Sequence, residues 1–375
     1  MKQVRVMISG GGTGGHIMPA LALCEYIHSR FPHAVLWYIG RAGSMEERLM
    51  KNEKVQFKRL HAAPFRSGFA FIAFLAVLCV GLVEGSVLIL KGNPDVIVGF
   101  GGYASAPLLL AGIILRRNVV VHEANAIPGK AVKMLVKLGA RFAYGLDSDN
   151  PVMRQLRDRA EKKKGACFTG NPLRAAFTQP PGQADYGFTG LNPADPILMV
   201  LGGSQGARFL NLLVCNACAE LKKRLPDLQI IHITGSADRD TVDSAYAMCD
   251  IRHYVTAFSD RINVLFEMAD VVLSRAGALT ISELCVAGLP AILVPYPFAA
   301  EKHQHENALL LAGKGGAIMI DQDEMNEHVL VDNVSSLCNN PDTMKHMGEI
   351  NRSMAMPRAA ENVWNFACNT HVYEQ

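Results

Sequence analysis

A glycine-rich loop followed directly by a histidine is the most distinctive chemical feature near the start of the chain. Residues 10–15 read GGGTGG, and His16 comes next. The loop contains the G-x-G-x-x-G spacing of dinucleotide-binding folds, but the second apolar run ends at Gly40-Arg41, with no acidic residue to hold a ribose diol. An imidazole can take a proton from a hydroxyl near neutral pH. The pattern favours close backbone approach to a phosphate-rich ligand, with the His16 imidazole directed at whatever occupies the same cleft. An NADP-dependent oxidoreductase, with Arg41 at the 2′-phosphate, is the alternative.

A second candidate site lies in the C-terminal half, where residues 274–283 read SRAGALTISE after the apolar run DVVL. Small residues up to Ala278 permit close approach of a ligand to the backbone. A helix that begins near Leu279 would direct its free N–H groups and the positive end of its dipole at an anion such as a pyrophosphate. Glu283, one turn further on, could accept hydrogen bonds from both ribose hydroxyls. It could equally be an acidic residue that only favours the helix dipole. The glycine loop GGSQGAR at 202–208 offers further phosphate contacts.

The elements that must position these residues are short β-branched runs separated by helix-compatible stretches. The runs are VRVMIS (4–9), AVLWYIG (34–40), DVIVGFGG (95–102), NVVVHEAN (118–125), PILMVLGG (196–203), LQIIHITG (228–235), DVVLSRAG (270–277) and PAILVPY (290–296). Strands that alternate with helices predict parallel sheets covered on both faces. A Gly/Pro-rich stretch at 178–196 divides the runs into two sets. We therefore expect two doubly wound α/β domains, each opening with a strand that ends in a glycine loop.

Charge is distributed unevenly along the 375 residues, although the net charge is only +3. Residues 1–168 contain 23 Lys and Arg against 11 Asp and Glu, whereas residues 169–375 contain 14 against 23. This asymmetry indicates that the N-terminal half meets something anionic, either a membrane surface or a phosphate-bearing substrate. Basic motifs interleaved with aromatic residues are absent from the sequence, so no nucleic-acid partner is expected.

Cysteine and carboxylate patterns give no metal or cofactor prediction. Nine cysteines are scattered, and only Cys215 and Cys218 form a C-x-x-C, which is typical of small residues on a helix. Asp147 and Asp149 have D-x-D spacing but lie far from the nucleotide motifs in the sequence. The N-terminus lacks the apolar core of a signal peptide, and the odd cysteine number fits a reducing cytoplasm.

One apolar segment stands apart from the strand pattern. Residues 69–83, FAFIAFLAVLCVGLV, are uninterrupted by polar side chains. As a helix these residues would reach about 22 Å, which is short for a bilayer core of about 30 Å. A buried helix, an interfacial helix that dips into a membrane and a true span all remain open. Lys130, Lys133 and Lys137 share one predicted helix face and favour the interfacial interpretation because they would attract anionic lipid.

Seven motifs in series resemble the MurG family of N-acetylglucosaminyltransferases. They are GGGTGGHIMPALAL, DVIVGFGGYASAP, HEANAIPG, GNPLR, GGSQGAR, SRAGALTISE and HQHENA (303–308). The resemblance covers nearly the whole chain and implies a GT-B fold, in which two Rossmann-like domains face each other across a cleft. It implies an N-terminal acceptor and membrane-docking domain at 1–168 and a C-terminal donor domain at 169–352. The last helix, about 353–370, is expected to cross back onto the N-terminal domain.

The resemblance also implies roles for individual residues. His16 matches the candidate general base, and Thr13, Gly14 and Gly15 match a loop that closes on donor sugar and acceptor phosphates. The implied donor contacts are Asn125 and Gln304 to the sugar, Arg174 to the nucleotide, Ser204 to the pyrophosphate, the Ser259 backbone to uracil, and the helix residues Ala278, Leu279, Thr280, Ile281, Ser282 and Glu283 to phosphate and ribose. One departure is that Ala124 stands where the family usually has glutamine, which leaves the hydrogen bonding around Asn125 open.

The activity implied by the resemblance is transfer of GlcNAc from UDP-GlcNAc to the 4-hydroxyl of the muramyl unit of lipid I, giving lipid II in peptidoglycan synthesis. Attack by a single activated hydroxyl implies inversion at the anomeric carbon, and the helix N-termini would stabilise the departing UDP without a metal. The expected partners are UDP-GlcNAc, lipid I and an anionic membrane surface, at the cytoplasmic face of the inner membrane. Another UDP-sugar enzyme of the same fold, such as a UDP-GlcNAc 2-epimerase or a glycolipid glycosyltransferase, is the alternative.

Overall fold

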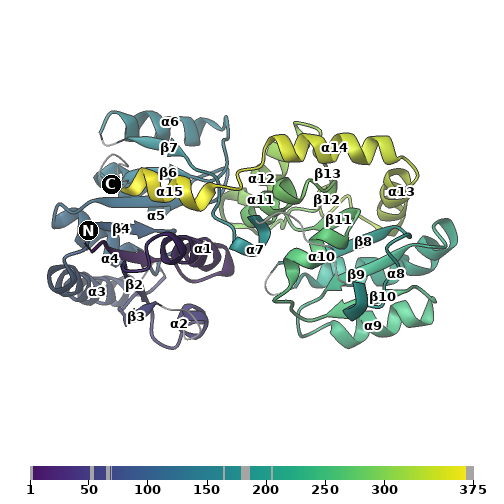
Figure 1. Cartoon of the computed structure of the whole chain (residues 1–375), viewed down its shortest axis with the longest axis horizontal. Helices are drawn as coiled ribbons and strands as arrows, with labels where there is room; N and C mark the ends of the chain where they lie inside the picture. Colours follow the sequence, from purple (N-terminus) through teal and green to yellow (C-terminus); the bar gives the residue numbers. More distant parts are fainter. Residues whose placement is uncertain are drawn as a thin grey trace. The chain divides into compact units, whose positions relative to one another are not determined.

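The computed structural model divides into two compact units, one formed by Met1–Ala175 with Met356–Gln375 and the other by Ala176–Ala355 (Figure 1). The structure describes residues 3–50, 55–64, 68, 70–163, 165–178, 186–203 and 206–368. We call the two parts the first and the second unit. The functional roles expected for residues 1–168 and 169–352 stay predictions.

The first unit is built on a parallel sheet. Its described strands are β1 (Arg5–Ser9), β2 (Val35–Gly40), β3 (Gln56–Arg59), β4 (Val96–Gly99), β5 (Val119–Glu123), β6 (Arg141–Tyr144) and β7 (Ala166–Phe168). They lie in the order β3-β2-β1-β4-β5-β6-β7, and all the pairs are parallel. This is the strand order of a doubly wound fold, in which the chain reverses direction across the sheet between β1 and β4.

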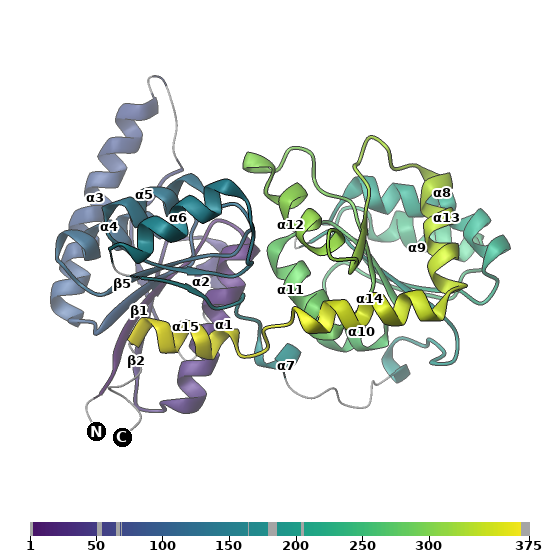
Figure 2. The ribbon, with the colours of Figure 1, turned by 90° about the horizontal axis from the view of Figure 1, so that it is seen from above.

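Helices cover both faces of this sheet. They are α1 (Gly14–Arg30), α2 (Met45–Met50), α3 (Ala70–Gly92), α4 (Ala106–Ile114), α5 (Lys130–Leu138), α6 (Pro151–Glu161) and α15 (Ala359–Cys368). Alternate strand residues enter two separate cores, as the two-residue period of a strand requires. Val6 and Ile8 of β1 pack in the core with α1 and α15, whereas Met7 packs in the core beneath α3, α4 and α5. Figure 2 shows α1 and α15 on one face and α4, α5 and α6 on the other.

The second unit repeats the same design. Its described strands are β8 (Ile197–Leu201), β9 (Gln229–Ile233), β10 (His253–Thr256), β11 (Val271–Ser274), β12 (Ala291–Leu293) and β13 (Ala317–Met319), in the order β10-β9-β8-β11-β12-β13. Its helices are α8 (Arg208–Arg224), α9 (Arg239–Met248), α10 (Ile262–Met268), α11 (Ala278–Ala287), α12 (His303–Ala312), α13 (Glu327–Cys338) and α14 (Pro341–Ser353), with short turns η1 (Tyr186–Phe188) and η2 (Ala300–Lys302). The short helix α7 (Ala175–Thr178) spans the boundary between the units. The expected pair of parallel α/β domains is confirmed.

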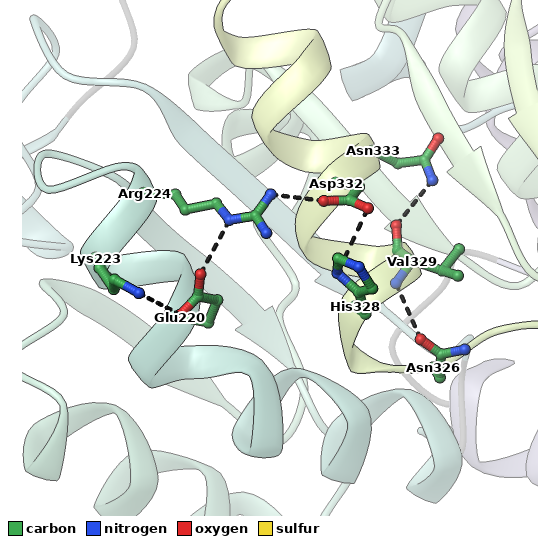
Figure 3. A network of polar contacts seen from close by, with 8 residues as sticks. All are labelled: Glu220, Lys223, Arg224, Asn326, His328, Val329, Asp332 and Asn333. Atoms are coloured by element: carbon green, nitrogen blue, oxygen red, sulfur yellow. Dashed lines mark hydrogen bonds and ion pairs between the residues drawn. The ribbon is translucent and has the colours of Figure 1, made fainter.

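A network of charged side chains joins α8 to α13 on the surface of the second unit (Figure 3). Arg224 donates to Glu220 of its own helix at 3.0 Å and to Asp332 of α13 at 2.6 Å. His328 approaches Asp332 at 3.5 Å. The hydrogen bond from Arg224 holds the pKa of Glu220 below its usual value. These side chains are solvated, so the network supplements the apolar core between the two helices and contributes little stability by itself.

The apolar segment predicted at 69–83 belongs to a longer helix, α3, which has 23 residues and continues to Gly92. Its length is therefore about 34 Å, and the expectation that it is too short to span a bilayer core is wrong. Among the described residues, α3 is the one helix long and apolar enough to cross a membrane by length and composition, and 17% of its apolar window is buried. Most of its side chains are thus not part of the protein core, so the buried-helix interpretation fails for them.

The second half of α3 packs closely on the rest of the first unit. A Cβ atom at Gly81 would lie 2.2 Å from the His61 carbonyl oxygen, and one at Gly85 would lie 3.3 Å from the Cβ of Ala111 in α4. Ile89 is fully buried. The two glycines therefore allow α3 and α4 to approach each other closely, while the first half of α3 stands out from the unit (Figure 2).

Candidate active site

The switch point of the first sheet brings two glycine loops together. Ligands of doubly wound folds bind where neighbouring strands lead in opposite directions, outside their carboxyl ends. Here β1 and β4 are those neighbours, and the loops that follow them begin at Gly10 and Phe100. The Phe100 N–H donates to the Ser9 carbonyl at 2.8 Å, which holds the two loops side by side.

His16 lies in the first turn of α1 at this point. Its Nδ1 is 3.1 Å from Oγ1 of Thr13, the residue that caps the helix. Thr13 Oγ1 makes no capping bond to the backbone, so the hydroxyl is directed at the imidazole instead. The structure therefore assigns Thr13 a contact that orients His16, which the sequence did not predict.

The imidazole lies against bare backbone. Cβ atoms built at Gly101 and Gly102 would lie 3.3 Å from Cδ2 and 3.2 Å from Nδ1 of His16, and the Gly102 atom would also lie 2.2 Å from the Gly11 carbonyl oxygen. Both glycines have positive φ, 78° and 74°. Any side chain at these positions would displace His16, so the two glycines are part of the site. They belong to the motif GFGGYASAP, but their spacing alone did not identify their role.

The loop after β5 is organised by a buried carboxylate. Glu123 Oε1 accepts from the N–H and from Nδ2 of Asn125, at 3.0 and 2.9 Å, and Oε2 accepts from the Gly129 N–H at 2.8 Å. Ala124 is buried, and its carbonyl accepts from Asn171 Nδ2 at 3.1 Å. Asn125 thus keeps a defined orientation without an amide at position 124. The sequence analysis did not predict that Glu123 holds this loop.

A second histidine, His122, is buried directly behind this region. Its Nε2 lies 3.0 Å from the Gly170 carbonyl, which fixes the proton on Nε2 because a carbonyl can only accept. Its Nδ1 is buried and has no hydrogen-bond partner among the described residues. Burial lowers the pKa of His122 to about 4, so the ring is neutral at pH 7.

The second unit has an equivalent switch point between β8 and β11. The loop after β8 passes close to the end of β9, where a Cβ at Gly206 would lie 2.1 Å from the Thr234 carbonyl oxygen, and Gly206 has φ 77°. Ser204, the predicted pyrophosphate contact in this loop, lies outside the described residues. The loop after β11 leads through Gly277 into α11, as the sequence predicts.

Helix α11 begins at Ala278, one residue before the expected start. Its hydrogen bonding starts with the Ile281 N–H, which donates to the Gly277 carbonyl at 2.9 Å, so Leu279 and Thr280 have no acceptor within the helix for their N–H groups. Ser282 Oγ donates back to the Ala278 carbonyl at 3.1 Å, which directs this hydroxyl along the helix. These N–H groups are the kind of donor that an anion can use, and the pyrophosphate contact stays a prediction.

Glu283 lies in the second turn of α11 and is half-buried. Burial raises the pKa of this carboxyl to about 7. A group that ionises near pH 7 can accept two hydrogen bonds when deprotonated, which is the state that recognition of a ribose diol requires. An exposed first-turn acid would show no such desolvation, so the burial favours a ligand-binding role over a helix-dipole role.

The remaining predicted donor residues have defined partners. Gln304, in the first turn of α12, accepts from the Tyr296 N–H at 2.9 Å. Ser259 Oγ accepts from the Arg261 N–H at 3.1 Å in the turn before α10. Arg174 forms an ion pair with Glu25 of α1, and the Ala175 N–H donates to the same carboxylate at 3.1 Å. In this structure Arg174 is therefore engaged with α1 of its own unit, and its contact to the nucleotide stays a prediction.

No cluster of His, Cys, Asp and Glu in the described part of the chain could hold a metal ion. Asp147 of the D-x-D sequence instead forms an ion pair with Arg157. Burial raises the pKa of the Cys215 thiol to about 11 and that of Cys218 to about 12, and Cys218 packs in the core of the second unit.

Both halves of the chain match one class of enzyme. Residues 6–143 match the glycosyltransferase family 28 N-terminal domain, and residues 197–363 match the C-terminal domain of that family. The chain is therefore a glycosyltransferase with both domains of its class. A protein of Halothermothrix orenii named UDP-N-acetylglucosamine–N-acetylmuramyl-(pentapeptide) pyrophosphoryl-undecaprenol N-acetylglucosamine transferase is 32% identical, over 98% of this chain and 99% of the relative. The crystal structure of Acinetobacter baumannii MurG is similar with a TM-score of 0.75 and 25% identity, over 98% of this chain and 99% of that one.

The chain belongs to the MurG family of these transferases. A putative UDP-N-acetylglucosamine 2-epimerase from Listeria monocytogenes is also similar, with a TM-score of 0.68 and 13% identity over 97% of this chain and 95% of the other. That likeness shows the fold alone.

Proposed function

We propose that this chain transfers GlcNAc from UDP-GlcNAc to the 4-hydroxyl of the muramyl unit of lipid I, giving lipid II, with inversion at the anomeric carbon. The observation that carries the proposal is the match along 98% of the chain to a relative whose name specifies both donor and acceptor. The geometry around His16 and Glu283 supplies groups suited to that chemistry.

His16 acts as the general base in this proposal. In the reactive form Nδ1–H donates to Thr13 Oγ1, and the lone pair is left on Nε2 to receive the proton of the attacking hydroxyl. A single base and direct attack by the acceptor give one displacement, which inverts the anomeric centre. Gly101 and Gly102 leave room for the ring, because neither carries a side chain.

The donor nucleotide is held by the second unit in this proposal. The diphosphate lies at the N-terminus of α11, where N–H groups and the helix dipole stabilise the negative charge that develops on UDP as it leaves. Glu283 accepts from the ribose hydroxyls, the Ser259 backbone contacts uracil, and Gln304 contacts the sugar. Arg174, which forms an ion pair with Glu25, is the proposed contact to the nucleotide from the first unit.

A membrane surface is the proposed location of the acceptor reaction, at the cytoplasmic face of the inner membrane. Ile72, Leu75, Val83, Val87 and Leu90 are exposed along α3, at spacings that place them on one side of the helix. Apolar residues are also exposed on α5, whose lysine stripe would attract anionic lipid by about 1 kcal/mol per residue near the surface. An exposed apolar surface of this kind is typical of a lipid-binding surface in a peripheral protein.

The test is transfer of radiolabel from UDP-[¹⁴C]GlcNAc to a lipid I analogue by the purified chain. We expect a disaccharide product whose anomeric proton shows the coupling of a β linkage. An α linkage would overturn the single-displacement mechanism. Conversion of UDP-GlcNAc to its 2-epimer, without transfer to the analogue, would overturn the proposed function and favour the epimerase alternative.

A further inference from the structure

The guanidinium of Arg275 is buried at the carboxyl edge of the second sheet. Arg275 follows β11 directly and is 7% exposed. Its Nη1 donates to the Val294 and Pro295 carbonyls at 3.0 and 3.2 Å, and its Nη2 donates to Gln322 Oε1 at 2.6 Å. All three acceptors are neutral. A buried cation held by neutral acceptors depends on each of them, because an unsatisfied charged donor is costly in the protein interior.

These contacts tie together the segments that follow neighbouring strands. Val294 and Pro295 come directly after β12, and Gln322 lies three residues beyond β13. The Cζ atom of Arg275 lies 5.7 Å from the ring centre of Phe209, in α8, and 5.5 Å from that of Tyr296. One guanidinium therefore fixes the relative positions of the main chain on which the donor-site loops are built.

The loop after β12 in turn sets the direction of the Gln304 amide. The Tyr296 N–H can only donate, so the Gln304 atom at 2.9 Å must be the carbonyl oxygen Oε1. Nε2 then faces the other way as a donor, and it has no partner among the described residues. A sugar hydroxyl oxygen would accept a hydrogen bond from it. If the main chain at residues 294–296 moved, the amide would lose this fixed direction.

We propose that Gln322 is a positioning residue for the donor sugar, acting through Arg275 and the main chain at residues 294–296 to orient the Gln304 amide. The inference rests on the proposed function, because it takes Gln304 as a ligand of the sugar. Gln322 lies in the polar sequence IDQDE, outside the motifs that identify the family. The side chain does not need to touch the donor to affect its recognition.

The test compares UDP with UDP-GlcNAc by calorimetric titration of the wild type, Gln322→Leu and Gln322→Glu. Leucine removes the acceptor at similar size, whereas glutamate keeps one. For Gln322→Leu we expect affinity for UDP-GlcNAc to fall about 3- to 10-fold, which is the effect of losing the neutral hydrogen bond between the Gln304 amide and the sugar. Affinity for UDP, which has no sugar at this position, should change less than about 2-fold. Gln322→Glu should restore the wild-type ratio of the two affinities. The double variant with Gln304→Ala should lose no more than Gln304→Ala alone.

The matched control is Gln229→Leu. Gln229 is a buried glutamine at the first residue of β9, at the amino ends of the strands of the same sheet, where it bonds to the main chain of Asn192. This variant should lower the midpoint of thermal unfolding and leave the ratio of the two affinities unchanged. Equal losses for UDP and UDP-GlcNAc in Gln322→Leu, or additive losses in the double variant, would overturn the positioning role. A wild type that binds neither nucleotide would instead overturn the proposed function.

Discussion

Replacing Glu283 by glutamine tests the donor site through two independent measurements. In the folded protein burial holds the pKa of Glu283 at about 7, whereas its ordinary value is 4.5. The folded state therefore keeps a proton between pH 4.5 and pH 7 that the unfolded state has lost. The stability linked to this group is fully present below pH 4.5 and is lost as the pH rises to 7.

The size of the stability effect follows from this shift. Each unit of pKa shift corresponds to about 1.4 kcal/mol, so the wild type should lose up to about 3 kcal/mol across the window. Glutamine does not titrate. The free energy of unfolding of Glu283→Gln, relative to the wild type, should therefore rise by that amount between pH 4.5 and 7. Urea titrations at several pH values measure the difference, and parallel curves for the two proteins would refute the desolvation argument.

The second measurement is nucleotide affinity. A carboxylate that accepts from both ribose hydroxyls contributes through hydrogen bonds to a charged group, at about 1.5–3 kcal/mol. At pH 8, where Glu283 is ionised, Glu283→Gln should weaken UDP binding by roughly 10- to 150-fold. Binding of 2′-deoxy-UDP should weaken much less, because one partner hydroxyl is already missing. Equal losses for the two ligands in calorimetric titration would refute the ribose assignment.

Four further predictions follow from the structure. Replacement of His16 by alanine should lower kcat about 10²- to 10⁴-fold with little change in KM for UDP-GlcNAc, and a near-normal kcat would exclude His16 as the base. Changing Phe71, Phe74 and Leu75 together to serine should release the folded protein from anionic liposomes in a sedimentation assay, whereas unchanged binding would contradict docking through α3. Transfer activity should largely survive EDTA, and loss that only Mg²⁺ or Mn²⁺ reverses would contradict departure of UDP at a helix N-terminus. Because burial lowers the pKa of His232 to about 3, this group should make the protein less stable as the pH falls from 6.5, and His232→Gln should flatten that slope in urea titrations; identical slopes would contradict the assignment.

The sequence predicted the central strands better than the edge strands. All eight apolar runs contain strands, because buried parallel strands need continuous β-branched residues. The strands β3, β6, β7, β10 and β13 were missed, and each lies at a sheet edge or has only three or four residues. β3 reads QFKR and is largely exposed, so its composition carries no apolar signal.

The sequence pointed to candidate site residues that follow a glycine loop or begin a helix. It did not point to residues that hold another loop or side chain in place. The sequence identified His16 and the start of α11, which follow glycine loops. It gave no signal for Glu123, whose carboxylate holds the next loop, or for the Arg275–Gln322 pair. Such roles depend on contacts between segments far apart in the chain. Residue spacing and hydrophobic periodicity are local patterns and do not predict these contacts.

The return of the last described helix to the first unit has a consequence for the order in which the protein can fold. Trp364 of α15 is 2% exposed and packs against Phe31 with ring centres 5.1 Å apart, and Asn362 Nδ2 donates to the Thr169 carbonyl at 3.1 Å. The core that α15 completes contains strands that precede the second unit in the chain. During synthesis the ribosome must produce the whole second unit before that core can close. Until then the apolar residues that Trp364 covers stay exposed on the first unit, where chaperones can bind them and aggregation can begin.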